Sequence, residues 1–365
     1  MAKVENKVRE PMFHIVKRPA IEKWQAWLIR GIAIVIAVLV SSVVVVLLTH
    51  ENPLEVFAGF FKGNFGTPRK IWNMVQKLSM LLVIAVAVTP AFKMKFWNLG
   101  AEGQVLAGGL SSMILMFYIK DKIPNALLLV AMFAAAVIGG IIWGIIPALF
   151  KAKWNTNESL FTLMMNYIAM QLVSFFIMYW VPNGSSVMGV VNQSTHAGWL
   201  PSLFGQKYLF NIIVVALCTV MMYIYLKYSK HGYEISVVGE SQNTARYIGI
   251  NVKSVIVRTM VFSGALCGLA GFLLVAGTDH SITTNLAGGN GFTAIIASWL
   301  AKFNPLTMVL TAFLIVFLGN GASQIAMQFG LNESVADIIS GIIIFFIIGC
   351  EFFINYRIVR THKEG

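Results

Sequence analysis

Residues 31–49 read GIAIVIAVLVSSVVVVLLT, a run of 19 residues without a charge. A helix rises 1.5 Å per residue, so about 20 apolar residues cross the hydrocarbon core of a bilayer. A second run, residues 125–150, contains 26 residues without a charge. Of the 365 residues, 58% are hydrophobic and 12% are charged, whereas soluble domains carry about 25% charged residues. The sequence therefore predicts an all-α protein, a polytopic bundle of transmembrane helices.

The apolar runs define ten candidate spans. They cover residues 28–49, 73–92, 98–119, 125–149, 158–181, 208–227, 255–277, 288–301, 305–321 and 333–355. The eighth and ninth are short and interrupted by Gly and Pro, so eight to ten spans are expected. Together they form one transmembrane domain, residues 28–356, between a basic tail of residues 1–27 and a short tail of residues 357–365.

The lysines and arginines indicate how the chain is oriented. With the N-terminal tail inside, 20 of the 27 Lys and Arg residues lie on the cytoplasmic side and 7 lie outside. Cytoplasmic loops are enriched in basic residues, so both termini are expected in the cytoplasm. The tail also lacks the apolar core and cleavage site of a signal peptide. Topology and contact with anionic membrane lipid explain the net charge of +12, and no module for binding nucleic acid is present.

The sequence contains none of the common catalytic patterns. There is no G-x-x-x-x-G-K-[ST] nucleotide loop, no H-E-x-x-H, and no Ser/His or Asp pair at a catalytic spacing within the spans. The three cysteines lie in or at the edge of predicted spans without paired spacing, which predicts neither a disulfide framework nor a metal site. We therefore expect a non-catalytic chain with no catalytic residues, no metal and no cofactor of its own.

Two glycine-rich stretches resemble each other. Gly100-Ala101-Glu102-Gly103 opens the third span and Gly288-Gly289-Asn290-Gly291 opens the eighth, and an Asn-Leu pair precedes each. In the predicted topology the third span starts inside and the eighth starts outside. This is the arrangement of inverted repeats, in which broken helices mark a translocation path. Chance similarity between glycine-rich strings is the alternative.

Glu102 is an unusual residue near the start of a span, because an ionisable group within the membrane is costly. One interpretation is structural: the carboxylate caps the amides of a broken helix or pairs with a lysine. The other places Glu102 at a polar gate near the inner mouth of a pathway, and the two are compatible. The predicted pathway residues are Asn98, Glu102, Gln104, Asn166, Asn290 and Ser298. The predicted broken-helix glycines are Gly100, Gly103, Gly289 and Gly291.

The loop of residues 228–254 is the larger cytoplasmic loop. Residues 239–249 predict a short helix with polar residues at its start and a glycine at its end. Its small, largely apolar face could dock on another protein. An interfacial helix on the lipid headgroups is the alternative, which Tyr247 and Arg246 would also suit.

Four stretches resemble the membrane permeases of ATP-binding-cassette importers. They are FWNLGAEGQVLAGG (96–109), NESLFTLMMNYIA (157–169), VVGESQNTARYIGINV (237–252) and GFTAIIASWLAKFNPLTMVLTAFLIVFLGNGA (291–322). Within that superfamily they resemble the group for simple sugars, branched-chain amino acids and nucleosides, and the N-L-G-A-E-G-Q stretch is most similar to nucleoside-importer permeases. The likeness covers residues 75–350 and leaves the basic N-terminal tail out.

The resemblance implies a hetero-oligomeric importer in a bacterial inner membrane. ATP and Mg would be bound by a separate ATPase subunit, a second and related permease would complete the pathway, and an extracytoplasmic binding protein would deliver the cargo. The implied ATPase-coupling residues are Gly239, Ala245, Arg246, Tyr247 and Gly249. Glu240-Ser241 departs from the Gly-x-Asn expected there, which leaves the details of that contact open.

Nucleosides are the cargo that the resemblance favours, with a simple sugar or a branched-chain amino acid as the alternative. A different class of protein, a secondary transporter driven by an ion gradient, would require a carboxylate in the middle of a span for the coupling ion. No carboxylate is in the middle of a predicted span, because Glu102, Asp337 and Glu351 each lie about one turn in from a predicted end. The sequence therefore favours the ATP-driven importer.

Overall fold

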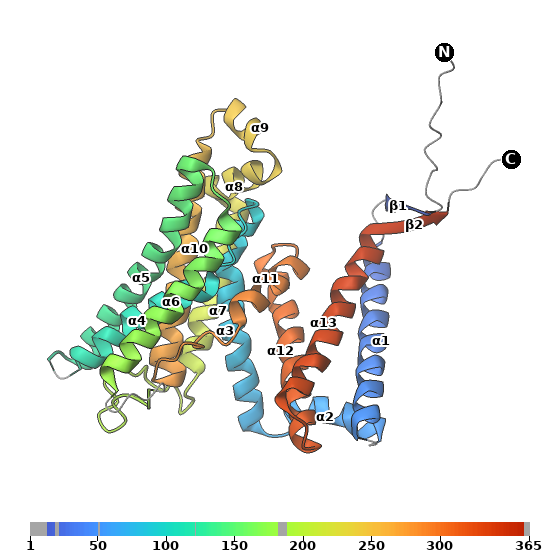
Figure 1. Ribbon diagram of the computed structural model, residues 1–365, viewed down its shortest axis with the longest axis horizontal. Helices are drawn as coiled ribbons and strands as arrows, with labels where there is room; N and C mark the ends of the chain where they lie inside the picture. The colour runs from blue at the N-terminus through green and yellow to red at the C-terminus, as the bar shows by residue number, and fades with distance from the viewer. Residues whose placement is uncertain (1–12, 19–21, 50–51, 121, 182–187, 361–365) are drawn as a thin grey trace, which may run out of the picture. The chain divides into compact units, whose positions relative to one another are not determined.

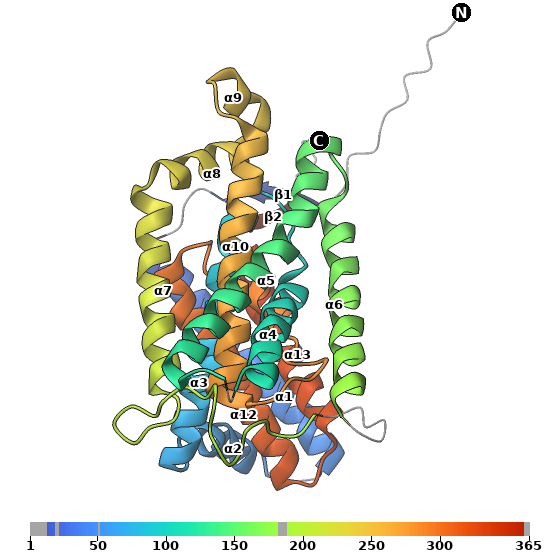
Figure 2. The same cartoon turned by 90° about the vertical axis from the view of Figure 1, so that its left-hand side faces the viewer.

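The computed structural model describes residues 13–18, 22–49, 52–120, 122–181 and 188–360. This part of the chain is helical, apart from two short strands (Figures 1 and 2). It divides into two compact units: one of residues 1–67 with 317–365, the other of residues 68–316. The outermost parts of both predicted tails, with Lys3, Lys7 and Arg9, lie outside the described residues.

The larger unit consists of a bundle of helices around a buried pair. Its elements are α3 (Pro68–Lys93), α4 (Ala101–Tyr118), α5 (Asn125–Trp154), α6 (Glu158–Trp180), α7 (Leu209–Tyr228), α8 (Lys230–Glu240), α9 (Gln242–Tyr247), α10 (Val252–Leu274), the π-helical turn η2 (Val275–Asp279), α11 (Asn290–Leu300) and the start of α12 (Pro305–Gln328). Most residues in the apolar stretches of α3 and of α10 with η2 are buried, 83% and 78% of them. In α5 and α7 the corresponding share is 28%. The pair α3 and α10 therefore forms the centre of the bundle.

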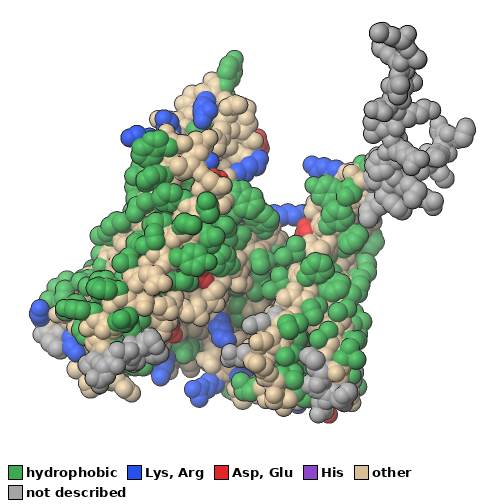
Figure 3. All heavy atoms as spheres, viewed as in Figure 1, with side chains coloured by type: hydrophobic (Ala, Val, Ile, Leu, Met, Phe, Trp, Pro, Cys, Tyr) green, Lys and Arg blue, Asp and Glu red, His purple; other side chains and the backbone are tan. Residues whose placement is uncertain are grey.

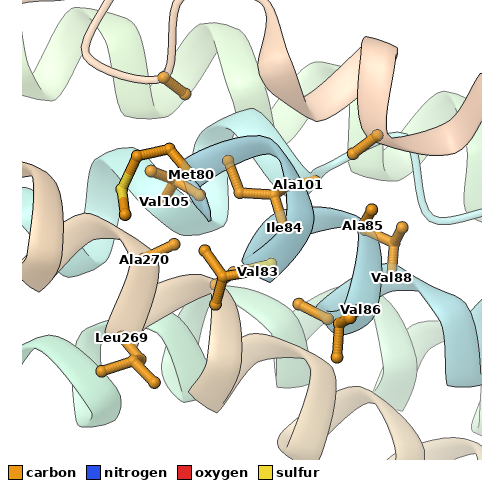
Figure 4. Packing of buried hydrophobic residues seen from close by; sticks show 14 of the residues in the cluster. Met80, Val83, Ile84, Ala85, Val86, Val88, Ala101, Val105, Leu269 and Ala270 are labelled. Carbon is orange, nitrogen blue, oxygen red and sulfur yellow. The ribbon is translucent and has the colours of Figure 1, made fainter. Parts of the chain in front are cut away.

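Apolar side chains from α3, α4 and α10 form the core of this unit. Val83 and Ile84 of α3 lie close to Val105 of α4 and to Leu269 and Ala270 of α10 (Figure 4). The outward faces of the helices are also largely hydrophobic, and most Lys and Arg side chains lie near helix ends (Figure 3). Apolar flanks with charged ends are what a bilayer requires of a helical bundle.

Glycines allow α5 and α10 to approach closely. A Cβ atom on Gly140 would lie 2.2 Å from the carbonyl oxygen of Gly264, and one on Gly268 would lie 2.2 Å from that of Ala136. Both separations are shorter than any van der Waals contact, so only glycine fits at these positions. The small-residue spacing of the two helices therefore serves backbone-to-backbone packing, as is common in membranes.

The smaller unit pairs the first and last helices of the chain. It contains α1 (Lys23–Thr49), α2 (Pro53–Phe65), the end of α12 and α13 (Glu333–Asn355). Arg30 Nε of α1 donates a hydrogen bond to Glu351 Oε1 of α13 at 2.9 Å. The strands β1 (Phe13–Lys17) and β2 (Tyr356–Arg360) pair antiparallel, with Phe13 opposite Arg360 and Lys17 opposite Tyr356.

The structure differs from the predicted tails. The helix expected to begin at residue 28 begins at Lys23, and each tail contains a strand. FHIVK and YRIVR are rich in β-branched and aromatic residues, which favour strands. Apolar run length does not detect a ribbon of five-residue strands, and it does not detect α2 either, because that helix has 13 residues and includes Lys62.

Most predicted spans correspond to observed helices. The polytopic all-α fold is confirmed, and eight described helices are long and apolar enough to cross a membrane. The span predicted at 98–119 corresponds to α4, and the one at 288–301 to α11. With 11 residues, α11 is about 16 Å long, half of the hydrocarbon thickness. The eighth predicted span is therefore a half-length helix, preceded by the non-helical residues 280–289.

Candidate functional site

The chain breaks between α3 and α4, where it has to turn back into the bundle. Lys95 adopts a positive φ of 60°, and residues 96–100 are not helical. Asn98 Oδ1 accepts a hydrogen bond from the N–H of Gly100 at 3.1 Å. Buried backbone groups outside regular structure need such partners, because an unpaired N–H or C=O inside the membrane costs free energy.

Side chains of α6 satisfy the rest of the broken segment. Asn166 Oδ1 accepts from the N–H of Gly103 at 2.8 Å, and its Nδ2 donates to the carbonyl of Leu99 at 2.8 Å. Thr162 Oγ1 accepts from the N–H of Leu99 at 3.1 Å. A Cβ atom on Gly103 would lie 2.8 Å from Asn166 Oδ1, so glycine is required for this approach. The non-helical segment, residues 94–100, ends at Gly100, whereas Gly103 lies in the first turn of α4.

The two similar glycine-rich stretches meet inside the larger unit. Glu102 Oε1 accepts a hydrogen bond from the N–H of Gly291 at 3.2 Å, and the carboxylate also interacts with the backbone N–H of Gly289. Gly289 precedes α11 with a φ of 77°, a conformation that suits glycine. Glu102 is only 5% exposed. Its carboxylate therefore caps the N-terminus of α11, where the free amides and the helix dipole favour negative charge.

The other predicted pathway residues are mostly buried. Gln104 Nε2 donates to Asn98 Oδ1 at 3.3 Å, and Ser298 Oγ lies 3.0 Å from Thr89 Oγ1 of α3. Asn98, Gln104, Asn166 and Ser298 are all buried, whereas Asn290 is half-buried. In this conformation the four buried side chains bond within the chain and present no surface to a solute. A role in lining a pathway stays a prediction for all six residues.

A pair of tryptophans beside this site was not singled out from the sequence. The rings of Trp97 and Trp299 lie edge to face, with centroids 5.2 Å apart, and Phe92 packs against both. Both indoles are about half exposed. Trp97 directly precedes Asn98 and Trp299 directly follows Ser298, so each tryptophan is next to a predicted pathway residue. Their proximity depends on α11 packing against α3, which no local pattern reveals.

The predicted coupling helix is two helices, α8 and α9, separated by Ser241. The Ser241 hydroxyl accepts from the N–H of Thr244 at 3.2 Å and so caps α9, while Gly249, with φ of 83°, ends the segment. In Figures 1 and 2, α9 extends beyond the ends of the spans. Tyr247 on this projection is 91% exposed, which is unusual for an aromatic side chain.

Two of the five predicted coupling residues face inward. A Cβ on Gly239 would lie 2.1 Å from the carbonyl oxygen of Lys93, so α8 packs against the end of α3. Ala245 is fully buried. Arg258 of α10 further holds α8 through an ion pair with Glu234, with Nη2 2.8 Å from Oε2. The exposed surface of this projection therefore includes Arg246, Tyr247, Ile248 and Gly249 beside the polar residues 242–244, and Gly239 and Ala245 position it.

Titratable side chains do not form a metal centre in the part of the chain that is described. No group of three or more His, Cys, Asp or Glu there could hold a metal ion. Glu102 meets backbone amides, as shown above. The chemistry of the site is therefore that of a polar, hydrogen-bonded break between helices.

The comparisons with known proteins identify the family. A family model described as the permease component of branched-chain amino acid transport systems matches residues 71–348. The chain belongs to this family. The expected membership in the permeases of ABC importers is confirmed, and the permease is accordingly a membrane component of such an importer.

Three relatives are similar over nearly their whole length. The guanosine ABC transporter permease protein NupP of Bacillus subtilis is 28% identical over 93% of this chain and 97% of its own. The glucose ABC transporter permease protein TsgB13 of Haloferax volcanii is 27% identical over 91% and 90%. The nucleoside ABC transporter permease protein NupB of Lactococcus lactis is 27% identical over 88% and 90%. The cargoes in these names differ, so similarity alone does not decide the cargo of this permease.

Proposed function

We propose that this permease forms the translocation pathway for nucleosides in an ATP-driven importer. The observation that carries the proposal is the meeting of two broken helices at Glu102 and Gly291, 189 residues apart in the chain. Broken helices that meet within a membrane bundle provide free helix ends and polar groups along a path. Two of the three relatives described above are named for guanosine or nucleosides, which supports that cargo.

A simple sugar is the second candidate cargo, because one relative of equal identity is named for glucose. A branched-chain amino acid is a third, since the family description names that class. Another relative is named as a probable riboflavin import permease, at 25% identity. All these cargoes are polar, which agrees with a path next to a carboxylate.

A second, related permease is the proposed partner within the membrane. In Bacillus subtilis, both NupP and NupQ carry the name of guanosine ABC transporter permease, and both are similar to this chain, at 28% and 22% identity. NupB and NupC of Lactococcus lactis form a corresponding pair, at 27% and 21%. This permease covers 97% of NupP but 72% of NupQ. We therefore place it in the role of NupP and expect a partner similar to NupQ.

The ATPase subunit, which binds ATP and Mg, is proposed to dock on α9. The exposed residues Arg246, Tyr247 and Ile248 lie on a projection held by a capped break and by the Arg258–Glu234 ion pair. A rigid exposed aromatic is typical of the centre of a protein interface. Because α9 extends beyond the ends of the spans, docking of a protein explains its position better than contact with lipid headgroups does.

Tyr247→Asp tests this docking in the purified importer. We expect cargo-stimulated ATP hydrolysis to fall about tenfold or more, because a carboxylate replaces an aromatic anchor. Tyr247→Phe, which keeps the ring, should retain most of the stimulation. Insertion into the membrane should be unchanged in both variants. Full stimulation in Tyr247→Asp would contradict the assignment of α9.

The cargo is tested by uptake in cells that lack this permease. Uptake of radiolabelled guanosine, adenosine, glucose and leucine is compared between the deletion strain and the same strain carrying the permease gene. We expect restored uptake of the nucleosides only, with unlabelled uridine as competitor. Restored uptake of glucose or leucine in place of nucleosides would assign the alternative cargo. Co-purification of an ATPase and a second permease with the tagged chain completes the test.

A further inference from the structure

The loop between α6 and α7 is fixed to the bundle over its described part, residues 188–208. The N–H of Leu200 donates to the carbonyl of Ala276 at 2.8 Å, and the N–H of Val191 donates to that of His280 at 2.8 Å. The indole of Trp199 stacks on the His280 ring, with centroids 3.7 Å apart. The loop therefore forms a positioned surface at the end of the unit opposite α8 and α9 (Figures 1 and 2).

The tip of this loop is a tight turn with an aromatic residue in an unfavourable conformation. Leu203 and Gln206 form a β-bridge, and the N–H of Gln206 donates to the carbonyl of Leu203 at 2.9 Å. The two residues between them, Phe204 and Gly205, have φ angles of 50° and 76°. Such a turn is normally made by Asn, Asp and Gly, because a side chain with a Cβ is strained at positive φ.

The side chain in this strained position is almost fully exposed. Phe204 is 94% exposed, the highest value among the exposed large hydrophobic residues of the described chain. An aromatic ring in water adds nothing to the packing of its own chain, and the turn would form more easily with Asn or Gly in its place. Strain and exposure at one residue together indicate a function outside the fold.

The surroundings of the ring indicate a protein rather than lipid as its partner. Ser202, Gly205 and Lys207 are exposed in the sequence around Phe204, as is Pro201, and Leu203 is half-exposed. The ring is therefore the one fully exposed aromatic group within a mainly polar rim. Anchors in a bilayer present a continuous apolar face, whereas a single aromatic with a polar rim is the usual anatomy of an interface hot spot. Residues 188–208 contain Lys207 and no carboxylate, while Asp279 is exposed next to His280, the residue that stacks on this loop. The charge nearest to Phe204 in the sequence is therefore the positive charge of Lys207.

We propose that Phe204 is the anchor by which the extracytoplasmic solute-binding protein docks on this permease. The ring enters an apolar pocket of the binding protein, and carboxylates at the rim of that pocket face Lys207. This inference rests on the proposed importer function and names the surface by which its soluble partner is recognised.

Three variants separate the anchor from the fold of the loop. Phe204→Asn removes the ring but suits a positive φ, so the turn should form as well as before or better. Phe204→Trp keeps an aromatic anchor. Tyr179→Ala removes another strongly exposed aromatic, at the end of α6, and serves as the matched control.

The binding protein is first identified by photo-crosslinking in intact cells from p-benzoylphenylalanine at position 204. Its purified soluble form is then titrated against the assembled importer, with ATPase and second permease, in lipid nanodiscs. We expect Phe204→Asn to weaken binding about tenfold or more, and Phe204→Trp and Tyr179→Ala to bind like the wild type. The thermal unfolding temperature should be unchanged in all three.

Equal affinity of Phe204→Asn and the wild type would overturn the inference. Crosslinks to lipid alone, without a protein product, would overturn it as well and assign the ring to the bilayer. Neither result contradicts the proposed function as long as the wild-type importer takes up nucleosides. A wild-type importer that transports nothing would instead refute the proposed function.

Discussion

Glu102 illustrates, at the scale of a residue, how a charge is accommodated beside a membrane. Its carboxylate is buried, and its oxygen accepts from the N–H of Gly291. Backbone amides at the N-terminus of a helix stabilise a negative charge without a partner cation. The capping role is therefore present in the structure, and the role at a gate remains a prediction that depends on the charge.

Substitution of Glu102 separates the cap from the charge. Glu102→Gln keeps an oxygen that can accept from Gly291, so we expect folding to be close to normal while nucleoside uptake falls. Glu102→Ala leaves buried amides unpaired, which should lower the free energy of unfolding by about 1–3 kcal/mol. Thermal unfolding and uptake of both variants provide the measurements. Wild-type stability of Glu102→Ala would exclude the cap as a contributor to the fold.

His280 is the second residue with a testable electrostatic property. It lies just after η2 and stacks on the loop between α6 and α7, where partial burial, Lys207 and His196 lower its pKa to about 4. A histidine has an ordinary pKa of about 6.5 in an unfolded chain. The neutral form is thus favoured in the folded protein. Its contribution to stability is complete above pH 6.5 and is lost as the pH falls towards 4.

We expect the unfolding temperature of the importer to decrease as the pH falls from 6.5 to 4. The contribution of His280 is about 1–2 kcal/mol, because the ring is only half-buried and solvent screens its charge. His280→Phe keeps a ring against Trp199 but does not titrate, so it should show a smaller decrease. Equal pH dependence of the wild type and His280→Phe would contradict this assignment.

At the scale of elements, the contact between α5 and α10 depends on glycines that face each other. A Cβ on Gly264 would lie 2.4 Å from the carbonyl oxygen of Gly140, whereas one on Gly341 of α13 would meet nothing within 4 Å. The sequence contains Gly140-x-x-x-Gly144 in α5 and Gly264-x-x-x-Gly268 in α10, a spacing of small residues that favours close helix packing in membranes. Which helices they join follows only from the structure.

Gly264→Ala and Gly341→Ala form a matched pair that tests this contact. Gly264→Ala should separate the two helices and destabilise the permease by about 1–3 kcal/mol. Gly341→Ala should be neutral or stabilise α13, since alanine favours helices by up to about 1 kcal/mol. The measurement is the unfolding temperature of each purified variant. Equal temperatures for the two would show that the crossing tolerates a methyl group.

For the molecule as a whole, the terminal strands determine which side of the membrane the ends share. Because β1 pairs with β2, the N-terminal and C-terminal segments lie on one side. The chain therefore crosses the membrane an even number of times, which agrees with ten spans when the eight long helices are joined by α4 and by one crossing made of the non-helical residues 280–289 together with the half-length α11. The distribution of Lys and Arg predicts that this side is cytoplasmic.

Reporter fusions test this orientation. Green fluorescent protein should be fluorescent at both termini, and alkaline phosphatase should be inactive at both, because phosphatase folds only outside the cytoplasm. A fusion at residue 204, in the outer loop, should show active phosphatase. Active phosphatase at either terminus would contradict the predicted topology.

The class of the protein and its approximate spans follow from the sequence, and two glycine-rich breaks are predicted from it. A bilayer sets the length of the apolar runs that cross it and requires every backbone group within it to be hydrogen-bonded. These features therefore depend on local sequence and can be predicted from it. At the start of α6, Asn157 Oδ1 accepts from the N–H of Leu160, and Asn is among the residues that favour such a cap. The short α2 and the terminal strands are missed, since neither needs a run of about 20 apolar residues.

The tertiary structure decides which remote groups satisfy those breaks. Asn166 bonds to Gly103 and Leu99, 63 and 67 residues away, and Glu102 caps α11 from 189 residues away. It also turns Gly239 and Ala245 inward and leaves Tyr247 and Phe204 exposed. Such pairings form when helices distant in the chain pack side by side. The local composition of a segment does not determine which helices become its neighbours.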